Sequence, residues 1–461
     1  MAEADKGAAP PGAPGEPEPV LRRAPFSDNP TVGARGQRTQ QRILDAALTV
    51  FGEVGYHPCS IDRIAKEAGC SRISFYQYFA GKEDVFRQLA GQVARQLNAS
   101  VEALGPLTPD LDGWTQLRNW VERYVEIHAR FTPVFSTFQS AVTSDEEVAG
   151  GSMRTGERNR ARLRARIEGS TVPDRSLDAT LDLLVKSVTA GIGTAATLRS
   201  AAPAAWPAGR VADALADVMH RTLFGLQPAV SVHPPARRRP PEIAFGPAMT
   251  KVLESHHDGA DLTPAGRRTL EALLAAGRQE LVKHGYHGTR VDDIVTAADL
   301  SHGAFYRYFE NKDEFARLLA GEAMRTVSTA FAGIPTEAVH ADGSGAEGAE
   351  ADGGVDGAAA LRTWLRRYNS AQAGEAALIR VWSDATFQEP ALRTESAAVL
   401  DWGRRQMARF LQPRPFGGDV DTEAVVLVAL LEVYGARARS SAATATAADV
   451  IERGLLGRTM D

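Results

Sequence analysis

Residues 55–91 read GYHPCSIDRIAKEAGCSRISFYQYFAGKEDVFRQLAG, and residues 285–321 read GYHGTRVDDIVTAADLSHGAFYRYFENKDEFARLLAG. The two stretches align without a gap at a constant offset of 230, and 16 of their 37 positions are identical. They share a Gly-Tyr-His opening, an Asp-x-Ile core, a Phe-Tyr-x-Tyr-Phe cluster preceded by Ser, and a Lys near the start of the next predicted helix. Such a repeat in one chain indicates two similar binding modules, or heads, which suit a target with two-fold symmetry.

The composition is that of a globular protein with several domains. The chain has 461 residues, which is enough for two to four domains, with 44% hydrophobic and 24% charged residues. Its longest apolar run, residues 424–431, is far shorter than the roughly 20 residues that a membrane span needs, and residues 1–20 lack the apolar centre of a signal peptide. We therefore expect a cytoplasmic protein without a membrane segment. The net charge of −5 does not exclude a local basic face.

Apolar residues recur with the period of a helix around both copies of the repeat. In the first copy Ile43, Leu44, Ala47, Leu48 and Phe51 form one stripe, and short helices are predicted after the break near residue 55. Ser71 is the predicted N-cap of one of these helices, and Ser60 of the helix before it. In the second copy Thr289 and Asp292 have the spacing of a capping box. Because no stretch alternates with the period of a strand, the predicted fold class is all-α.

This order of short helices is typical of a helix-turn-helix, whose second helix reads bases in the DNA major groove, about 12 Å wide. Arginine can make two hydrogen bonds with guanine, so Arg72 is the leading candidate for reading a base. Tyrosine hydroxyls and helix starts commonly bind phosphates, and a phosphate would offset the unfavourable position of Lys82 and Lys312 at a helix N-terminus. For any one tyrosine, a packed ring is an equal alternative, and the two serines could act as caps alone. The candidate DNA-binding residues are Arg38, Ser71, Arg72, Ile73, Ser74, Tyr76, Tyr78 and Lys82 in the first copy, and Arg268, Ser301, His302, Gly303, Ala304, Tyr306, Tyr308 and Lys312 in the second.

The motif resembles the TetR family of transcriptional regulators. The resemblance rests on RILDAALTVFGEVGY, on IDRIAKEAGCSRISFYQYFAGKEDVF, and on the second copy ending in GAFYRYFENKDEF. It implies a three-helix DNA-binding head followed by a larger helical domain that binds a small molecule and pairs subunits through its last two helices. It also implies repression that ends when the ligand binds. Ile73 stands where the family commonly has glycine, whereas Gly303 keeps the glycine.

The likeness between the two halves extends beyond the heads. LRNWVERY at residue 117 matches LRTWLRRY at residue 361, and each half ends in two long apolar helical patterns. The shift in offset from 230 to 244 fits a Gly- and Ala-rich insert in the second half. The predicted domains are a disordered tail (1–34), a first head (35–92), a first regulatory domain (93–226), a linker (227–264), a second head (265–322) and a second regulatory domain (323–461) with a flexible insert at about 332–358.

The duplication predicts an intramolecular pseudo-dimer. Family members usually pair as two identical subunits, and here the apolar helices around Leu181–Val188 and Val425–Leu431 would pair within one chain. A single chain could then span two half-sites about one helical turn apart, roughly 34–36 Å centre to centre. The half-sites should differ because CSRIS and LSHGA present different groups. A homodimer of tandem chains, with four heads, remains an alternative.

The sequence is less specific about ligands. Trp120, Tyr124, His128 and Phe135, with Trp364, Tyr368 and Trp382 in the second half, are candidate residues for an unknown small-molecule effector, although such aromatic patterns also occur in plain cores. Cys59 and Cys70 are read as reduced small residues, with a redox sensor as the alternative. No catalytic motif, metal-ligand pattern or cofactor site is found, so an enzyme is not expected. The remaining alternative is a ligand- or partner-binding protein of the same fold that has lost DNA binding.

Overall fold

The structure is a computed structural model that describes residues 33–137, 146–227, 230, 239–246, 250, 262–341, 356–386, 390–437 and 440–458. Throughout these ranges the regular structure is helical, and the only strand-like feature is an isolated bridge between Leu107 and Ile167. The all-α fold predicted from the sequence is therefore confirmed. All but the last two residues of the predicted tail lie outside the described part. The chain divides into two compact units, one of Met1–Val50 with Cys59–Gln88 and one of Phe51–Pro58 with Leu89–Asp461.

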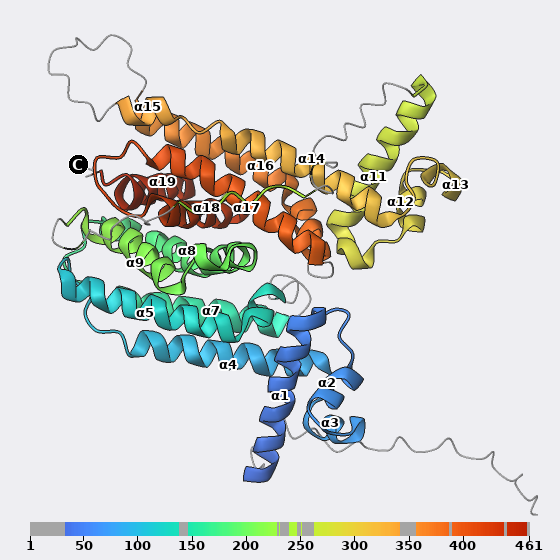
Figure 1. Ribbon diagram of the computed structural model, residues 1–461, viewed down its shortest axis with the longest axis horizontal. Helices are drawn as coiled ribbons and strands as arrows, with labels where there is room; N and C mark the ends of the chain where they lie inside the picture. Colours follow the sequence, from blue (N-terminus) through green and yellow to red (C-terminus); the bar gives the residue numbers. More distant parts are fainter. Residues whose placement is uncertain are drawn as a thin grey trace, which may run out of the picture. The chain divides into compact units, whose positions relative to one another are not determined.

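The first unit is the first head (Figure 1). Its buried residues include Ile43, Ile64, Phe75 and Phe79, and the two aromatic rings lie 5.7 Å apart. Side-chain caps fix where the short helices begin. Ser60 Oγ accepts the N–H of Arg63, and Ser71 Oγ accepts the N–H of Ser74 at 3.1 Å, as the sequence predicted. The helices are α1 (Ala34–Val54), of which all but the last turn lies in this unit, α2 (Ile61–Glu67), α3 (Arg72–Tyr78) and the start of α4 (Lys82–Glu102).

The second head belongs to the larger unit. Phe305, Phe309 and Phe315 pack together at its centre, with ring centroids 4.9–5.4 Å apart. Arg278 forms ion pairs with Glu322 of the same head at 2.7 Å and with Glu375 of the regulatory domain at 2.9 Å. The second pair joins the head to that domain. The helices of this head are α11 (Pro264–Gly288, kinked at Gly285), α12 (Val291–Ala297), α13 (His302–Phe305) and α14 (Lys312–Ala332).

The turn between the two short helices has the same backbone form in both heads. Gly69 has φ +61°, and Asp299 at the equivalent position has φ +54°. This left-handed region suits glycine, and aspartate tolerates it better than most residues. The capping box predicted from Thr289 and Asp292 is wrong. Thr289 Oγ1 instead donates to carbonyls of α11, and the carboxylate of Asp293 accepts the N–H of Arg290 at 2.8 Å.

The regulatory helices of both halves share one continuous apolar core. Helix α8 (Asp174–Ala201) has the length and the mean hydropathy (1.2) of a membrane span, but half of its most apolar 18-residue stretch is buried inside the fold, as in a core helix. The helices of the first half are α5 (Leu111–Arg130), α7 (Glu146–Arg164), α8 (Asp174–Ala201), η2 (Pro203–Ala205) and α9 (Ala208–Phe224). Those of the second half are α15 (Thr336–Ala341), α16 (Gly357–Thr386), α17 (Pro390–Leu411), α18 (Val420–Arg437), α19 (Ser441–Val450) and η3 (Ile451–Leu455).

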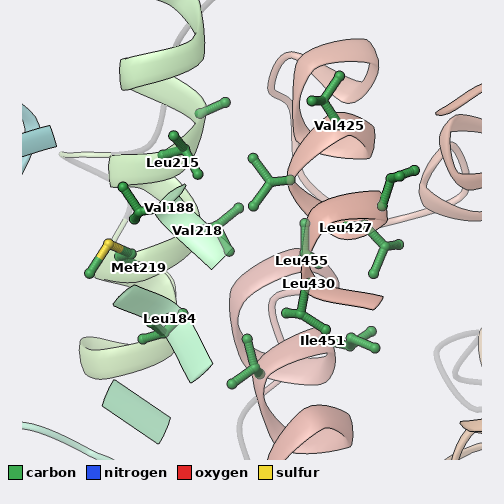
Figure 2. Packing of buried hydrophobic residues seen from close by; sticks show 14 of the residues in the cluster. Leu184, Val188, Leu215, Val218, Met219, Val425, Leu427, Leu430, Ile451 and Leu455 are labelled. Atoms are coloured by element: carbon green, nitrogen blue, oxygen red, sulfur yellow. The ribbon is translucent and has the colours of Figure 1, made fainter. Parts of the chain in front are cut away.

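The core crosses the boundary between the two halves. Helix α8 packs along α18, and α9 packs against η3. Figure 2 shows apolar side chains of α8 and α9, among them Leu184 and Val218, beside those of α18 and η3, among them Leu427 and Leu455. These side chains are buried, so the boundary is formed as a core and not as a wet surface contact.

Equivalent positions of the two halves meet at this boundary. The sequence ADVMHRTLFG (216–225) recurs as ADVIERGLLG (448–457), which makes Thr222 and Gly454 equivalent. The two touch, because a Cβ added to Gly454 would lie 2.3 Å from Thr222 Oγ1 and 2.8 Å from the carbonyl oxygen of Val218. The close approach therefore requires a glycine on one side of the contact.

Two connecting segments predicted from the sequence lie in part within the described residues. Residues 239–246 of the predicted linker lie against α17, where the N–H of Ile243 donates to Asp401 and the N–H of Gly246 donates to Glu395, both at 3.0 Å. Within the predicted insert at 332–358, helix α15 forms and Val339 is buried, while residues 342–355 lie outside the described part.

Candidate nucleic-acid interface

The start of α3 presents an arginine that is already held in place. Arg72 Nη1 lies 3.0 Å from Asp62 Oδ2, and its guanidinium group lies 5.8 Å from the centre of the Tyr76 ring. Both charged side chains are more than half exposed. Asp62 lies on α2, the supporting helix of the helix-turn-helix, and Arg72 lies on α3, its reading helix. The pair therefore links the two helices. An exposed ion pair of this kind adds little stability, but it restricts the directions in which Arg72 can point.

The second head repeats this arrangement with a different residue at the start of α13. His302 Nε2 lies 2.9 Å from Asp292 Oδ1, and the His302 ring lies 5.1 Å from the Tyr306 ring. Each of these residues is 230 positions after its counterpart in the first head. Sequence reasoning missed the two aspartates as functional residues, although the shared Asp-x-Ile pattern marked them. The duplication has thus kept an acid on the supporting helix, a basic or imidazole side chain at the start of the reading helix, and a tyrosine one turn later.

The remaining predicted residues of the reading helices are on the surface. Ser71, Ile73, Ser301 and Gly303 are exposed, and Ser74 and Ala304 are half-buried. Arg38 and Arg268 are exposed at equivalent positions near the starts of α1 and α11.

The four predicted tyrosines differ in their surroundings. Tyr306 is exposed, while Tyr76 and Tyr78 are half-buried. The hydroxyl of Tyr308, three residues after the end of α13, donates to the carbonyl oxygen of Gly266 at 2.9 Å, near the start of α11. Because that proton is already used within the head, Tyr308 serves the predicted phosphate contact less well than Tyr306.

Lys312 is held by the protein's own backbone. Its Nζ donates to the carbonyl oxygens of Tyr286 at 2.8 Å and Thr289 at 3.0 Å, and it lies 4.4 Å from the centre of the Tyr286 ring. Burial lowers the pKa of this ammonium group, and the charge of Asp313 partly opposes the shift. The sequence suggested a phosphate as the partner that offsets the unfavourable helix start. The structure places carbonyls at the C-terminal end of α11 in that role, where the helix dipole favours a cation.

Replacing Lys312 by methionine is expected to destabilise the second head by about 1–3 kcal/mol, because the two carbonyls lose their donor. Urea unfolding followed by circular dichroism measures the change. Lys283→Met, on the exposed side of α11, is the matched control and should stay within about 0.5 kcal/mol of the parent. Equal midpoints for the two variants would show that the carbonyl contacts of Lys312 contribute nothing to stability.

Three of the predicted effector residues of the first half, Trp120, Tyr124 and His128, lie along one face of α5, and Phe135 follows the end of that helix. Trp120 and Tyr124 are buried, with ring centroids 5.7 Å apart, and the Tyr124 hydroxyl lies 2.8 Å from Thr189 Oγ1. The His128 ring stacks on Phe135 at 4.5 Å, and burial lowers the pKa of His128 to about 4. Within the described part of the chain, the indole nitrogen of Trp120 has no hydrogen-bond partner. This face is therefore aromatic and uncharged near neutral pH.

The equivalent face in the second half is arranged differently. Trp364 Nε1 donates to the carbonyl oxygen of Ala330 at 2.8 Å, and its ring stacks on Tyr368 with centroids 5.7 Å apart. Burial raises the pKa of the Tyr368 hydroxyl. The side chain of Trp382 lies outside the described part of the chain. The indole that lacks a partner in the first half is thus satisfied in the second.

The cysteines and possible metal ligands add no further site. Cys59 is buried and Cys70 half-buried, and burial raises the pKa of both thiols, which disfavours the reactive thiolate. Among the residues that the structure describes, no group of three His, Cys, Asp or Glu side chains could hold a metal ion.

Comparison with known proteins agrees with the two heads. A sequence profile described as "Bacterial regulatory proteins, tetR family" matches residues 43–89 and again residues 273–319. The chain carries two tetR-family heads in tandem. The two matched segments cover the helix-turn-helix of each head, including both reading helices and both supporting aspartates.

Curated relatives match parts of the chain. The HTH-type transcriptional repressor LfrR of Mycolicibacterium smegmatis is 31% identical over 118 residues, which are 25% of this chain and 58% of LfrR. The fatty acid metabolism regulator protein of Bacillus subtilis is 35% identical over 65 residues, which are 13% of this chain and 34% of that protein. The HTH-type transcriptional regulator EthR of Mycobacterium tuberculosis is 28% identical over 204 residues, 43% of this chain and 82% of EthR. These are names of regulators and not of enzymes.

The first two of these matches span only 58% and 34% of the relatives' lengths. A solved structure of FadR from Bacillus subtilis in complex with stearoyl-CoA aligns with 39% of this chain and 96% of FadR, at a TM-score of 0.30 and 16% identity. A TM-score this low carries no argument about the fold or the ligand. The family assignment rests on the two heads.

Proposed function

We propose that this chain is a sequence-specific DNA-binding repressor that a small-molecule effector releases from its operator. The observation that carries the proposal is the repeated reading geometry, in which an aspartate on the supporting helix holds the first residue of the reading helix in both heads. A helix-turn-helix places these first residues against base edges in the major groove. Two such readers in one chain suit a two-part operator. The same role implies a cytoplasmic location.

The rival hypothesis is a ligand- or partner-binding protein that has lost DNA binding, and two departures from the expected motif would favour it. One is Asp299, which stands in the second turn where the first head has Gly69. Because Asp299 adopts nearly the same φ as Gly69, the turn geometry is retained and this support falls away. The other departure, Ile73, is exposed on the reading helix and leaves the core of the head intact.

The two halves would act as an intramolecular pseudo-dimer that reads an asymmetric operator. The packing of α8 along α18 and the contact of Thr222 with its equivalent Gly454 support this pairing. The asymmetry follows from Arg72 in one head and His302 in the other, because arginine can make two hydrogen bonds with guanine and an imidazole ring presents different groups. The domain boundaries expected from the sequence suit this scheme of two heads and two paired regulatory domains.

The effector would bind in the first half, beside Tyr124 and His128. The low pKa of His128 keeps its ring neutral near pH 7, and the unpartnered indole nitrogen of Trp120 offers a donor. An uncharged aromatic or aliphatic molecule with one hydrogen-bond acceptor fits such surroundings.

Selection of bound duplexes from random DNA at low salt tests the DNA-binding role. The chain is expected to enrich one asymmetric sequence, bound by one chain per duplex, with an affinity that falls steeply as salt rises because phosphate contacts release counterions. Native mass spectrometry of the winning complex gives the stoichiometry. A perfect palindrome or two chains per duplex would contradict the single-chain reader, and failure to enrich any duplex would contradict DNA binding itself.

A further inference from the structure

An isoleucine on the reading helix of the first head is exposed without a structural reason. Ile73 is 78% exposed, which is the largest value among the big apolar side chains that the structure describes as exposed. It follows Arg72 in the first turn of α3, and the core of the head is formed by Phe75, Phe79 and their neighbours without it. A single exposed apolar residue is ordinary on a protein surface, so its place beside the guanine-reading candidate is what gives it meaning.

The chemistry of the major groove matches this pair of neighbours. Arginine recognises guanine through O6 and N7, and an apolar side chain recognises thymine through its 5-methyl group. Asp62 and the Tyr76 ring hold Arg72 from the side of the protein, which fixes its direction at the helix start. Ile73 is β-branched, so its side chain has few rotamers and offers a defined apolar surface next to that arginine.

The second head lacks the same surface. Gly303 occupies the position of Ile73, and a Cβ added there would meet no heavy atom within 4 Å. The residue before it is His302, which is paired with Asp292 as Arg72 is paired with Asp62. The two heads therefore share one frame and differ in the groups that they present at two successive positions.

We propose that Ile73 determines specificity by contacting the 5-methyl group of a thymine beside the guanine read by Arg72, and that this contact occurs in one half-site only. The inference rests on the proposed DNA-binding function and refines it. Burial of one methyl group against isoleucine corresponds to about a fourfold gain in affinity.

Replacement of single thymines by deoxyuridine in the selected duplex tests the contact, because the two bases differ only in the 5-methyl group. With the parent protein, one position in one half-site is expected to lose about fourfold in affinity, and the other thymines little. Ile73→Ala, which keeps a good helix former at this position, should bind the thymine and deoxyuridine duplexes equally. Gly303→Ile should create a new sensitivity to deoxyuridine in the opposite half-site.

The outcomes separate this inference from the function on which it rests. A duplex that binds tightly but shows no deoxyuridine effect overturns the role of Ile73 and leaves DNA binding intact. A deoxyuridine effect that persists in Ile73→Ala also overturns it, because another residue then reads the methyl group. Circular dichroism shows whether Ile73→Ala is folded. If no duplex binds at all, the proposed function fails and this inference fails with it.

Discussion

Replacing Glu423 by alanine is expected to destabilise the chain by about 3–5 kcal/mol, because the change leaves the buried Arg414 without a carboxylate partner and the buried Arg221 with Asp217 alone, 4.0 Å away. Glu423 is fully buried and forms ion pairs with Arg221 at 2.6 Å and with Arg414 at 2.5 Å. Both guanidinium groups also lie within 5 Å of the centre of the Phe416 ring. Arg221 comes from α9 of the first half and Glu423 from α18 of the second, so the loss falls on the boundary between the halves.

Within the part of the chain that the structure describes, the buried ion pairs of Glu423 have no equivalent at the corresponding place in the other half. Arg453 is the equivalent of Arg221, but it donates to Thr171 Oγ1 at 3.0 Å and has no such buried carboxylate partner among the described contacts. One half therefore supplies the central carboxylate and the other the arginine that reaches it. This arrangement favours pairing of unlike halves over pairing of like ones, since a copy of the first half would bring no glutamate to Arg221.

Urea unfolding of Glu423→Ala should be measured beside Glu102→Ala as a matched control. Glu102 also forms an ion pair, with Arg162 at 2.9 Å, but it is more than half exposed. An exposed pair contributes about 0–1 kcal/mol, so the control should unfold close to the parent. Similar small effects in the two variants would show that the buried network does not hold the halves together.

Arg72→Glu is expected to weaken binding to the selected duplex by about 100-fold or more. The change places two acidic side chains together at the start of the reading helix, because Asp62 stands within 3.0 Å of the present guanidinium group. Repulsion from the DNA phosphates then disables the first head. When two heads in one chain bind one duplex, the second binding event is intramolecular, so loss of either head removes the gain from this high effective concentration.

Titration of a labelled duplex by fluorescence anisotropy measures this loss. Arg158→Glu makes the same change of charge at an exposed position of α7 and should bind within about threefold of the parent, since a distant surface charge acts only through a screened field. His302→Glu should cause a loss similar to that of Arg72→Glu, because either change leaves a single working head. If Arg72→Glu binds the duplex as tightly as the parent does, then the first head does not contact the DNA.

Much of each head could be predicted from residues that are near one another in the sequence. The stripe from Ile43 to Phe51 predicted α1, and the serines at 60 and 71 predicted where α2 and α3 begin. Helical period and capping are local properties, because they depend on contacts three or four residues apart. The sequence also predicted that the apolar helices around Leu181–Val188 and Val425–Leu431 pair as a pseudo-dimer, since long apolar helices must be covered; that pairing stays a proposal, which the packing of α8 along α18 supports.

The partners of polar side chains were harder to predict. The sequence predicted phosphate contacts for Lys312 and Tyr308, yet both side chains donate to backbone carbonyls of the same head. It placed Thr289 in a capping box, yet the bend at Gly285 brings carbonyls of α11 within its reach. A donor takes whichever acceptor the folded chain brings near, and several acceptors compete at every helix end.

The amino-acid sequence by itself determined that this chain is helical, that it carries two helix-turn-helix heads, and that the second short helix of each head begins with different residues. These properties follow from local periodicity and from the identity of residues at the start of each reading helix. Only the tertiary structure decided that aspartates hold those residues, and that Arg221 meets Glu423 across 202 positions of sequence. The physical reason is that helices form from near neighbours, whereas a charge far along the chain finds its partner only when the packed cores fix its place.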